Sequence, residues 1–270
     1  MRLAFCSVSS ALLLKPLPDV YSASFNPNQV PKNNKIKAEI EFRVCVNRTC
    51  RRQGSRETLE ILSGLAPADV SVNSCGCLGR CGSGPNLVVL PDGIMVRHCG
   101  TPSRAAEVML SICGGSNDSL DVKKNLEALA LRKRGEEAFE KGAFAEAELL
   151  LSQALGLKPF GGLHIIHTSR SAARLAVGNT SGALEDAEAA STLAPQYPKA
   201  YICQADAFLA KDEFEAAEKS YSIALQIDPS IRRSKSFKVS SAFFNSFCGT
   251  DYKTSGEARS CKSASLASMF

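Results

Sequence analysis

A pattern of small residues and prolines with a nearly fixed period is the feature of this sequence that most constrains its fold. Ala147, Ala154 and Pro159 recur in the same order twice more, at Ala183, Ala190, Pro195, Ala217, Ala224 and Pro229. The first step of the pattern is 36 residues and the second is 34 residues. Self-similarity at a fixed period of about 20–50 residues indicates a repeat protein, in which each unit packs against its neighbours.

Each unit has the sequence of two amphipathic helices separated by a turn. The first unit reads LEALALRKRGEEAFEKG and then AFAEAELLLSQALGLKP. Gly135 and the recurring alanines are small where we expect the two helices to cross closely. The proline ends the second helix because it cannot donate to the backbone ladder. The two extra residues of the first step fall around Phe160-Gly161-Gly162-Leu163, where a turn can absorb them.

The period, the small positions and the terminal proline resemble the tetratricopeptide repeat (TPR), a helix–turn–helix unit of about 34 residues. The resemblance covers residues 128–161, 164–197 and 198–231 and implies an all-α solenoid of three repeats. In this family the first helices of successive units line a groove that binds a protein partner. The resemblance places in that groove Arg132, Glu136, Phe139, Thr168, Leu175, Lys199, Ile202, Asp206 and Leu209. The alternative for the apolar members is a position in the core between repeats.

One familiar use of such a groove is to grip the C-terminal carboxylate of a heat-shock chaperone through two lysines, two asparagines and an arginine. The corresponding positions here resemble Arg132, Glu136, Ser169, Lys199 and Cys203. Only the charges at Arg132 and Lys199 are kept, and Glu136 would repel a carboxylate at close range. We therefore expect a protein partner other than a chaperone C terminus.

A second domain is indicated by the distribution of the eleven cysteines, because seven of them lie between residues 45 and 113. Segment 39–113 begins with AEIEFRVCVN, a strand ending near Cys45, followed by the amphipathic helix SRETLEILSGL and the short strand ADVSVNS. NLVVL and GIMVRHC flank a Pro-Asp-Gly turn, and TPSRAAEVMLSIC is a closing helix capped by Thr101. The order β-α-β-β-β-α predicts a small α/β domain that a staple or a metal would help to stabilise.

Four cysteines of this domain form two closely spaced pairs. Cys45 and Cys50 give C-x4-C after the first strand, and Cys77 and Cys81 give C-x3-C after the second. Four thiolates in two pairs are typical of an iron–sulfur or zinc site. The second pair lies in CGCLGRCGSGPN, where the glycines let backbone amides approach the sulfur atoms.

The runs VCVNRTCRRQGS and CGCLGRCGSGPNLVVLPDG resemble the thioredoxin-like [2Fe-2S] ferredoxins, which include the small ferredoxin-like subunit of NADH dehydrogenases. The resemblance implies a thioredoxin-like fold over residues 39–113 and a [2Fe-2S] cluster on Cys45, Cys50, Cys77 and Cys81. Cys75 is an alternative to Cys77 as a ligand. A zinc site on the same thiolates and a pair of disulfides without metal stay open as alternatives.

Basic side chains surround the predicted cluster site, and core thiols are expected elsewhere in the domain. Arg48, Arg51, Arg52 and Arg80 lie close to the cysteine pairs in the sequence. They either steer an acidic electron donor to the site or balance the negative charge of the cluster. Cys99 and Cys113 are predicted to pack as small hydrophobic residues.

The two ends of the chain differ from both domains. Residues 1–38 contain one acidic residue and many serines, which predicts a transit peptide to the chloroplast stroma, with the mitochondrial matrix as the alternative. The apolar stretch 3–14 suits a secretory signal as well, but it is too short to span a membrane. Residues 114–127 are predicted as a linker and the start of the first helix, and residues 232–270 as a basic, Ser-rich tail that is largely disordered.

The formal net charge of +5 comes from the two ends, so the sequence gives no indication of a nucleic-acid-binding domain. No acid–base pair, nucleophilic triad or phosphate-binding loop is evident, and we expect that the protein is not an enzyme in its own right. The sequence favours transfer of electrons to, or redox sensing for, a plastid partner held in the TPR groove. One alternative is a non-redox assembly factor that scaffolds a photosynthetic or membrane complex with a structural metal or cluster. Another is a redox switch that forms disulfides among Cys75, Cys77 and Cys81.

Overall fold

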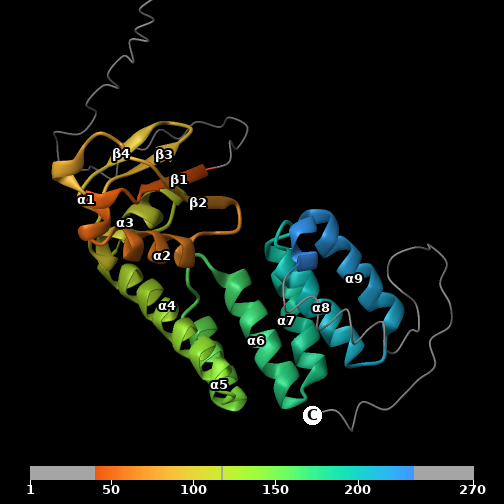
Figure 1. Cartoon of the computed structure of the whole chain (residues 1–270). Helices are drawn as coiled ribbons and strands as arrows, with labels where there is room; N and C mark the ends of the chain where they lie inside the picture. Colours follow the sequence, from red (N-terminus) through yellow and green to blue (C-terminus); the bar gives the residue numbers. More distant parts are fainter. Residues whose placement is uncertain (1–39, 117, 234–270) are drawn as a thin grey trace, which may run out of the picture.

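The computed structural model describes residues 40–116 and 118–233, which form a small sheet domain followed by an array of helices (Figure 1). The predicted transit peptide, 1–38, and residues 234–270 of the predicted tail lie outside the described residues. The chloroplast location, which rests on residues 1–38, therefore stays a prediction. Within the described part of the chain, no helix is long and apolar enough to cross a membrane.

The sheet domain contains four strands, β1 (Ile40–Cys45), β2 (Val70–Cys75), β3 (Leu87–Leu90) and β4 (Ile94–Val96), in the order β2-β1-β3-β4. β1 and β2 are parallel, whereas β3 is antiparallel to both β1 and β4. A parallel pair needs a crossover connection, which is supplied here by α2 (Ser55–Leu65). β3 and β4 are joined by the predicted turn, where Gly93 has a φ of +69° that favours glycine. The four strands and this helix lie where the sequence predicts them.

One short helix, α1 (Arg48–Arg52), was not predicted. The Asn47 side chain caps it by accepting a hydrogen bond from the backbone N–H of Arg48 at 2.6 Å. Five residues are too few to show a helical period, and the cap is the only signal that the sequence carries. Cys50, which the sequence places after the first strand, consequently lies on a helical turn.

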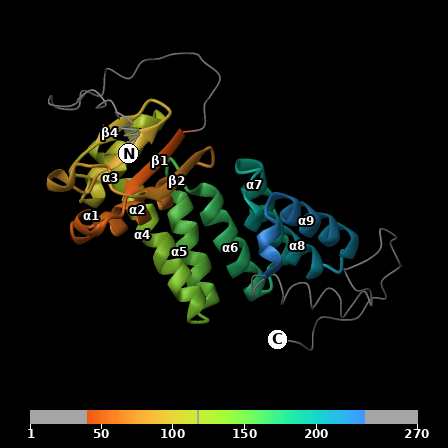
Figure 2. The same ribbon diagram turned by 45° about the horizontal axis from the view of Figure 1, so that its top comes forward.

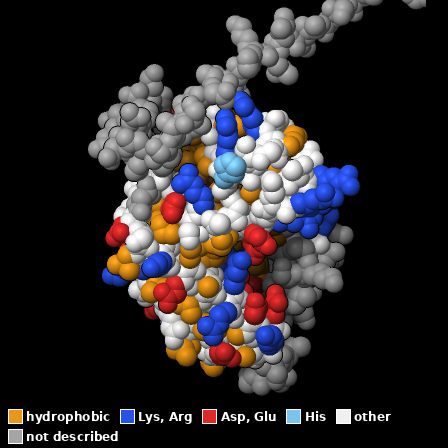
Figure 3. Space-filling model, turned by 90° about the vertical axis from the view of Figure 1, so that its left-hand side faces the viewer, with side chains coloured by type: hydrophobic (Ala, Val, Ile, Leu, Met, Phe, Trp, Pro, Cys, Tyr) orange, Lys and Arg blue, Asp and Glu red, His pale blue; other side chains and the backbone are white. Residues whose placement is uncertain are grey.

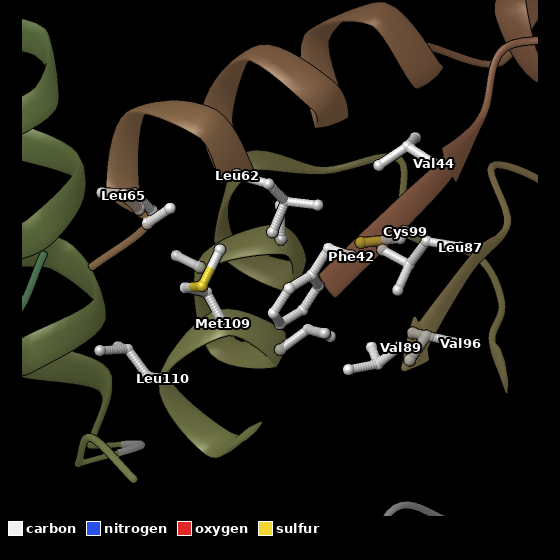
Figure 4. Packing of buried hydrophobic residues seen from close by; sticks show 14 of the residues in the cluster. Phe42, Val44, Leu62, Leu65, Leu87, Val89, Val96, Cys99, Met109 and Leu110 are labelled. Atoms are coloured by element: carbon white, nitrogen blue, oxygen red, sulfur yellow. The ribbon is translucent and has the colours of Figure 1, made fainter. Parts of the chain in front are cut away.

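The core of the sheet domain lies between the sheet and the pair of helices α2 and α3 (Pro102–Cys113). Phe42 is fully buried and points from β1 toward Leu62 of α2 and Met109 of α3 (Figure 4). α3 begins with the predicted cap, since the Thr101 side chain accepts a hydrogen bond from the backbone N–H of Arg104 at 3.3 Å. The core therefore fixes the strand ends on which the cysteines lie.

The helical part consists of three consecutive helix pairs (Figures 1 and 2). The pairs are α4 (Ser119–Glu140) with α5 (Phe144–Gly156), α6 (Leu163–Val177) with α7 (Thr180–Leu193), and α8 (Pro198–Leu209) with α9 (Phe214–Ile227). All six recurring alanines are completely buried. A Cβ atom at Gly135 would lie 2.8 Å from the Cγ atom of Leu151, which confirms that α4 and α5 cross closely at the predicted position.

The first repeat is built into the core of the sheet domain. Val122 and Leu129 of α4 are buried in the same hydrophobic cluster as Leu65 of α2 and Leu110 of α3. The sequence predicts a linker and the start of the first helix over residues 114–127; in the structure the helix begins at Ser119, and Val122 in this stretch is part of the core. α4 therefore belongs to both domains at once.

The two extra residues of the first repeat make a second connection to the sheet domain. A Cβ atom at Gly161 would lie 2.0 Å from the backbone oxygen of Leu65, so only glycine fits there. The backbone N–H of Gly162 donates to the backbone oxygen of Ala66 at 3.0 Å. The turn that absorbs the two extra residues thus also contacts the backbone at the end of α2.

Candidate functional site

The four predicted ligand cysteines come together at one end of the sheet as a buried pair and an exposed pair. Cys45 ends β1 and Cys50 lies on α1, and each is 1% exposed. Cys77 follows β2 and Cys81 begins the short 3-10 turn η2 (Cys81–Ser83), and both are exposed. The Sγ atoms of Cys77 and Cys81 are 3.4 Å apart. One half of the site is therefore shielded from solvent, and the other half is open to it.

The protonation of these thiols depends on burial and on their neighbours. Burial raises the pKa of the Cys50 thiol, and the nearby Cys45 and Cys81 thiols raise it further. The pKa of Cys77 is lowered because the backbone N–H of Gly79 donates to its Sγ atom at 3.4 Å. The adjacent Cys77 in turn raises the pKa of Cys81. Cys77 is thus the thiol of the exposed pair that loses its proton first.

A fifth thiol, Cys75, lies beside these pairs. It is the cross-strand partner of Cys45 in the parallel β1–β2 ladder and is half-buried. Its pKa is raised, first by burial and then by the neighbouring Cys45. Because Cys75 is close to the site, the alternative that it replaces Cys77 as a ligand stays open.

The geometry of the exposed pair fits metal ligation. Two thiolates on one tetrahedral metal ion lie about 3.8 Å apart, close to the separation of 3.4 Å between Cys77 and Cys81. The Asn86 side-chain amide lies 3.9 Å from the Cys50 Sγ atom, so donors face both pairs. Among residues 40–116 and 118–233, no three or more His, Cys, Asp and Glu side chains are grouped around the position of a single metal ion. The thiols are arranged in pairs rather than as one set of four.

Two other cysteines of the domain belong to the core, as predicted. Cys99 is fully buried, and burial raises its pKa to about 11. Burial raises the pKa of Cys113 to about 12, and its thiol donates to the sulfur of Met109 at 3.5 Å. Thiols that stay protonated are poor metal ligands.

The arginines near the site are solvent-exposed. Arg48, Arg51 and Arg52 are exposed on α1, and Arg80 lies between Cys77 and Cys81. Figure 3 faces the side of the molecule where α1 lies and shows Lys and Arg side chains gathered toward the sheet-domain end. These four arginines, called the arginine rim below, surround the exposed cysteine pair with positive charge.

The predicted groove residues fall into different environments on the first helices α4, α6 and α8. Arg132, Thr168 and Leu209 are buried, which corrects the prediction that they line an open groove. Leu209 belongs to the core between α8 and α9, the alternative expected for apolar members of the set.

Three further groove residues pack within the helix pairs. Phe139 lies against Phe144 with ring centroids 5.2 Å apart. Ile202 packs against the core of the third pair, and Asp206 accepts a hydrogen bond from the Tyr221 hydroxyl. Residues that pack within a helix pair and residues that contact a partner occupy the same helix positions. The sequence pattern alone therefore does not tell packing residues from binding residues.

The remaining members, Glu136, Leu175 and Lys199, keep exposed side-chain surface on three different helices. They are the predicted residues best placed to contact a partner. They carry one negative charge, one apolar side chain and one positive charge.

The positions that correspond to a carboxylate clamp are bonded to one another. Arg132 Nε lies 3.5 Å from a carboxylate oxygen of Glu136, and Arg132 Nη1 donates to the backbone oxygen of Gly64 at 3.4 Å. The Ser169 hydroxyl donates to the same Glu136 carboxylate at 3.1 Å. Arg132 is therefore ion-paired with Glu136 and hydrogen-bonded to the sheet domain, and the Ser169 hydroxyl is bonded to Glu136.

The last two clamp positions differ from each other. The Cys203 thiol donates to the backbone oxygen of Thr168 at 3.7 Å, and burial raises its pKa to about 12. Lys199 is exposed at the start of α8. Lys199 thus supplies the one freely presented cation among the five positions.

A buried ion-pair network joins α5, α6 and α7 and was not predicted. Asp186 is 2% exposed, and its carboxylate accepts hydrogen bonds from Arg170 at 2.6 and 2.8 Å and from Arg174 at 3.0 Å. The ring Nδ1 of His167 lies 2.8 Å from the same carboxylate, and Arg174 also pairs with Glu148 of α5 at 2.9 Å. The sequence signal was the spacing of three and four residues between His167, Arg170 and Arg174 of α6, which places them on one helix face.

Comparisons with known proteins bear on the helical part. No family model matches the sequence. The STIP1 homolog of Dictyostelium discoideum is 35% identical over 103 residues, which cover 38% of this chain and 18% of that protein. The Hsp70-Hsp90 organizing protein of Triticum aestivum is 34% identical over 99 residues, covering 37% and 17%. The helix pairs form a TPR repeat domain.

The TPR domain is shared with these relatives, but the chain spans less than a fifth of the length of either of them. Among solved structures, the first TPR of Spaghetti (RPAP3) bound to the HSP90 peptide SRMEEVD is 22% identical. It covers 47% of this chain and 96% of its own, with a TM-score of 0.41. The thioredoxin-like ferredoxin identity of the sheet domain stays a prediction.

Proposed function

We propose that this protein is a TPR scaffold that binds a segment of a partner protein and holds it beside the cysteine site. The observation that carries this proposal is the continuity of the two parts. The first of the three TPR helix pairs shares a hydrophobic core with the sheet domain through α4, and the turn before the second pair contacts it at Gly162. A partner on the first helices is therefore held at a fixed distance from the cysteines. This is the non-redox scaffold that the sequence allows as an alternative.

The partner segment recognised by this scaffold differs from an acidic C-terminal peptide. The Spaghetti structure contains the peptide SRMEEVD, which carries acidic side chains beside its terminal carboxylate. In this chain Glu136, one of the positions that the TPR resemblance assigns to a carboxylate clamp, presents a carboxylate with a side chain that is 39% exposed. Like charges at close range repel one another, and Arg132 and Ser169 already bond to Glu136. A neutral or basic internal segment suits this surface better.

The first prediction follows from this geometry and concerns the peptide SRMEEVD. Fluorescence anisotropy with the labelled peptide is expected to show no saturable binding to the full-length protein. The double variant Glu136→Asn/Ser169→Asn removes the repulsion and adds amide donors, so we expect saturable binding at least about tenfold tighter than the upper limit set by the wild type, the equivalent of about 1.4 kcal/mol. A matched control is Glu137→Asn, an exposed neighbour on the same helix.

Tight binding of this peptide by the wild-type protein, abolished by Lys199→Ala, would contradict the proposal. It would mean that the chain uses a chaperone clamp despite Glu136. Equal affinities of the double variant and the Glu137→Asn control would show that Glu136 does not decide the specificity.

A second candidate function, cluster binding, is favoured by the arrangement of the cysteines in pairs. Two irons bridged by sulfide take two thiolates each, and the pairs Cys45/Cys50 and Cys77/Cys81 supply them. Support comes from the 3.4 Å separation in the exposed pair and from the N–H donors of Gly79 and Asn86. When bound, such a cluster supplies either one-electron chemistry or a structural crosslink. The chain itself would anchor one side in the buried pair and leave the other side open to a partner.

Electron transfer is the more specific function that a bound cluster would give this protein. The exposed arginine rim supports it, because positive charge around an open redox site attracts an acidic donor. The zinc alternative uses the same thiolates and needs no electron donor. The two are separated by the identity of the bound metal and by its response to a reductant.

The second prediction concerns one ligand of the exposed pair. In Cys81→Ser we expect the iron content to be at least about tenfold lower than in the wild type, because a neutral hydroxyl is a poor replacement for a thiolate. Elemental analysis of the anaerobically purified full-length chain measures it. Cys113→Ser is the matched control, because that thiol is held protonated in the core. Unchanged iron in Cys81→Ser, or equal losses in both variants, would remove Cys81 from the site.

A further inference from the structure

We propose that Cys77 and Cys81 form a reversible oxidation site, in which a peroxide converts the two thiols into a disulfide. Their Sγ atoms are 3.4 Å apart and both residues are exposed. A disulfide bond is about 2.05 Å long, so the sulfur atoms must approach by about 1.4 Å. The pair is thus poised within one small movement of the bonded state.

The backbone around this pair has room for that movement. Cys77 lies in the segment between β2 and η2, outside any strand or helix. Cβ atoms built at Gly76, Gly79 and Gly82 would meet no other atom within 4 Å. The loop can therefore close the gap without displacing the core.

Burial protects three of the neighbouring cysteines from oxidation and leaves Cys75 as a competitor. Cys45 and Cys50 are 1% exposed, and Cys99 is fully buried, so a dissolved peroxide reaches none of them directly. Cys75 is half-buried and is fixed at the end of β2 in register with Cys45. Cys75 is accordingly the nearest competitor and the residue against which the pair must be tested.

The chemistry requires one equivalent of hydrogen peroxide. One thiolate attacks a peroxide oxygen, the O–O bond breaks, and protonation of the departing hydroxide gives water and a sulfenic acid. The second thiol then attacks the sulfenic sulfur, so that the S–S bond forms, the S–O bond breaks and a second water leaves. In total two thiols and one peroxide give one disulfide and two waters, and a dithiol reductant reverses the step by exchange.

The disulfide has a consequence for the cluster site, and this consequence rests on the proposed function. Cys77 and Cys81 are also the exposed ligand pair of the candidate cluster. A chain with this disulfide has only the buried pair left for a metal. Oxidation would therefore stop cluster loading until the disulfide is reduced.

Peptide mapping of the full-length protein tests the proposal. The anaerobically purified chain is treated with hydrogen peroxide, before and after removal of bound metal with a chelator, and its free thiols are alkylated. Trypsin cleaves after Arg80, between the two cysteines, so a disulfide keeps the two peptides linked with a loss of two hydrogens in mass spectrometry. We expect this linked pair in the wild type and in Cys75→Ser, its separation by dithiothreitol, and its absence in Cys77→Ser.

Two results would overturn the inference. One is a linkage of Cys77 or Cys81 to Cys75, and the other is full alkylation of both Cys77 and Cys81 after peroxide treatment of the metal-free chain. The metal content of the same sample, measured before treatment, separates this proposal from the previous one. Absence of metal contradicts cluster binding but leaves the disulfide intact, whereas absence of the linkage contradicts the disulfide whatever metal is found.

Discussion

Replacing Asp186 with alanine is expected to lower the free energy of unfolding of the repeat domain by about 3–5 kcal/mol. The Asp186 carboxylate is the shared partner of Arg170, Arg174 and His167 at distances of 2.6 to 3.0 Å. Its removal leaves the largely buried Arg170 guanidinium without its anion and Arg174 paired with Glu148 alone, which is costlier than the loss of a pair as a whole. Urea unfolding of the full-length protein, followed by far-ultraviolet circular dichroism, measures the change.

The control for this prediction is Glu188→Ala, an exposed acidic residue on the same helix, which we expect to change the unfolding free energy by less than about 0.5 kcal/mol. If Asp186→Ala and Glu188→Ala unfold at the same urea concentration, the network contributes nothing to the stability of the repeats.

The same carboxylate gives the repeats an acid-sensitive stability. Burial raises the pKa of Asp186, but the hydrogen bonds from His167 and Arg170 outweigh burial and hold it below the ordinary value of 3.8. A folded-state pKa below the unfolded-state value gives stability that is present above about pH 4 and is lost as the pH falls through the lowered pKa. The wild-type unfolding free energy should therefore drop more steeply below pH 4 than that of Asp186→Asn, which has no proton to bind.

The second large effect is expected at the contact between the sheet domain and the repeats. In Gly161→Ala the added Cβ atom would lie 2.0 Å from the Leu65 backbone oxygen and 2.9 Å from the backbone of Ala66 and Pro67. No side-chain rotation can relieve a clash with backbone atoms, so the two domains must move apart locally. We expect a destabilisation of about 3 kcal/mol, at the upper end of overpacking costs.

Thermal unfolding and limited proteolysis measure this effect, with faster cleavage expected around residues 157–163. Gly156→Ala is the matched control, because a Cβ atom at Gly156 would meet no atom within 4 Å. An unfolding temperature of Gly161→Ala equal to that of the control would show that the turn is not held against α2.

The parts of the fold that the sequence predicts are those with local and repeated signals. The recurring alanines report close helix crossings directly, and all six are buried. The β-rich runs and the Pro-Asp-Gly turn likewise identify four strands and their hairpin. Contacts between the domains leave no such signal: Gly161 and Arg132 face α2 of the sheet domain across long sequence separations.

The candidate sites show the same difference between local signals, which the sequence reveals, and contacts between distant segments, which it does not. Cysteine spacing marks the two pairs because a metal or cluster requires a fixed local geometry. The groove residues were assigned from family positions on the first helices, and burial of Arg132, Thr168 and Leu209 shows that helix register alone does not separate core from surface. The Asp186 network was missed because its anion lies on a different helix from its cations.

The metal and sulfide content of the anaerobically purified full-length protein, with its absorption spectrum, tests the central claim about the cysteine site most directly. A scaffold that carries a two-iron cluster on Cys45, Cys50, Cys77 and Cys81 should contain two irons and two acid-labile sulfides per chain and absorb visible light. Iron with this stoichiometry that dithionite reduces would extend the account to electron transfer. Zinc without iron, or four freely alkylated thiols in the protein as purified, would contradict cluster binding and leave the TPR scaffold as the function.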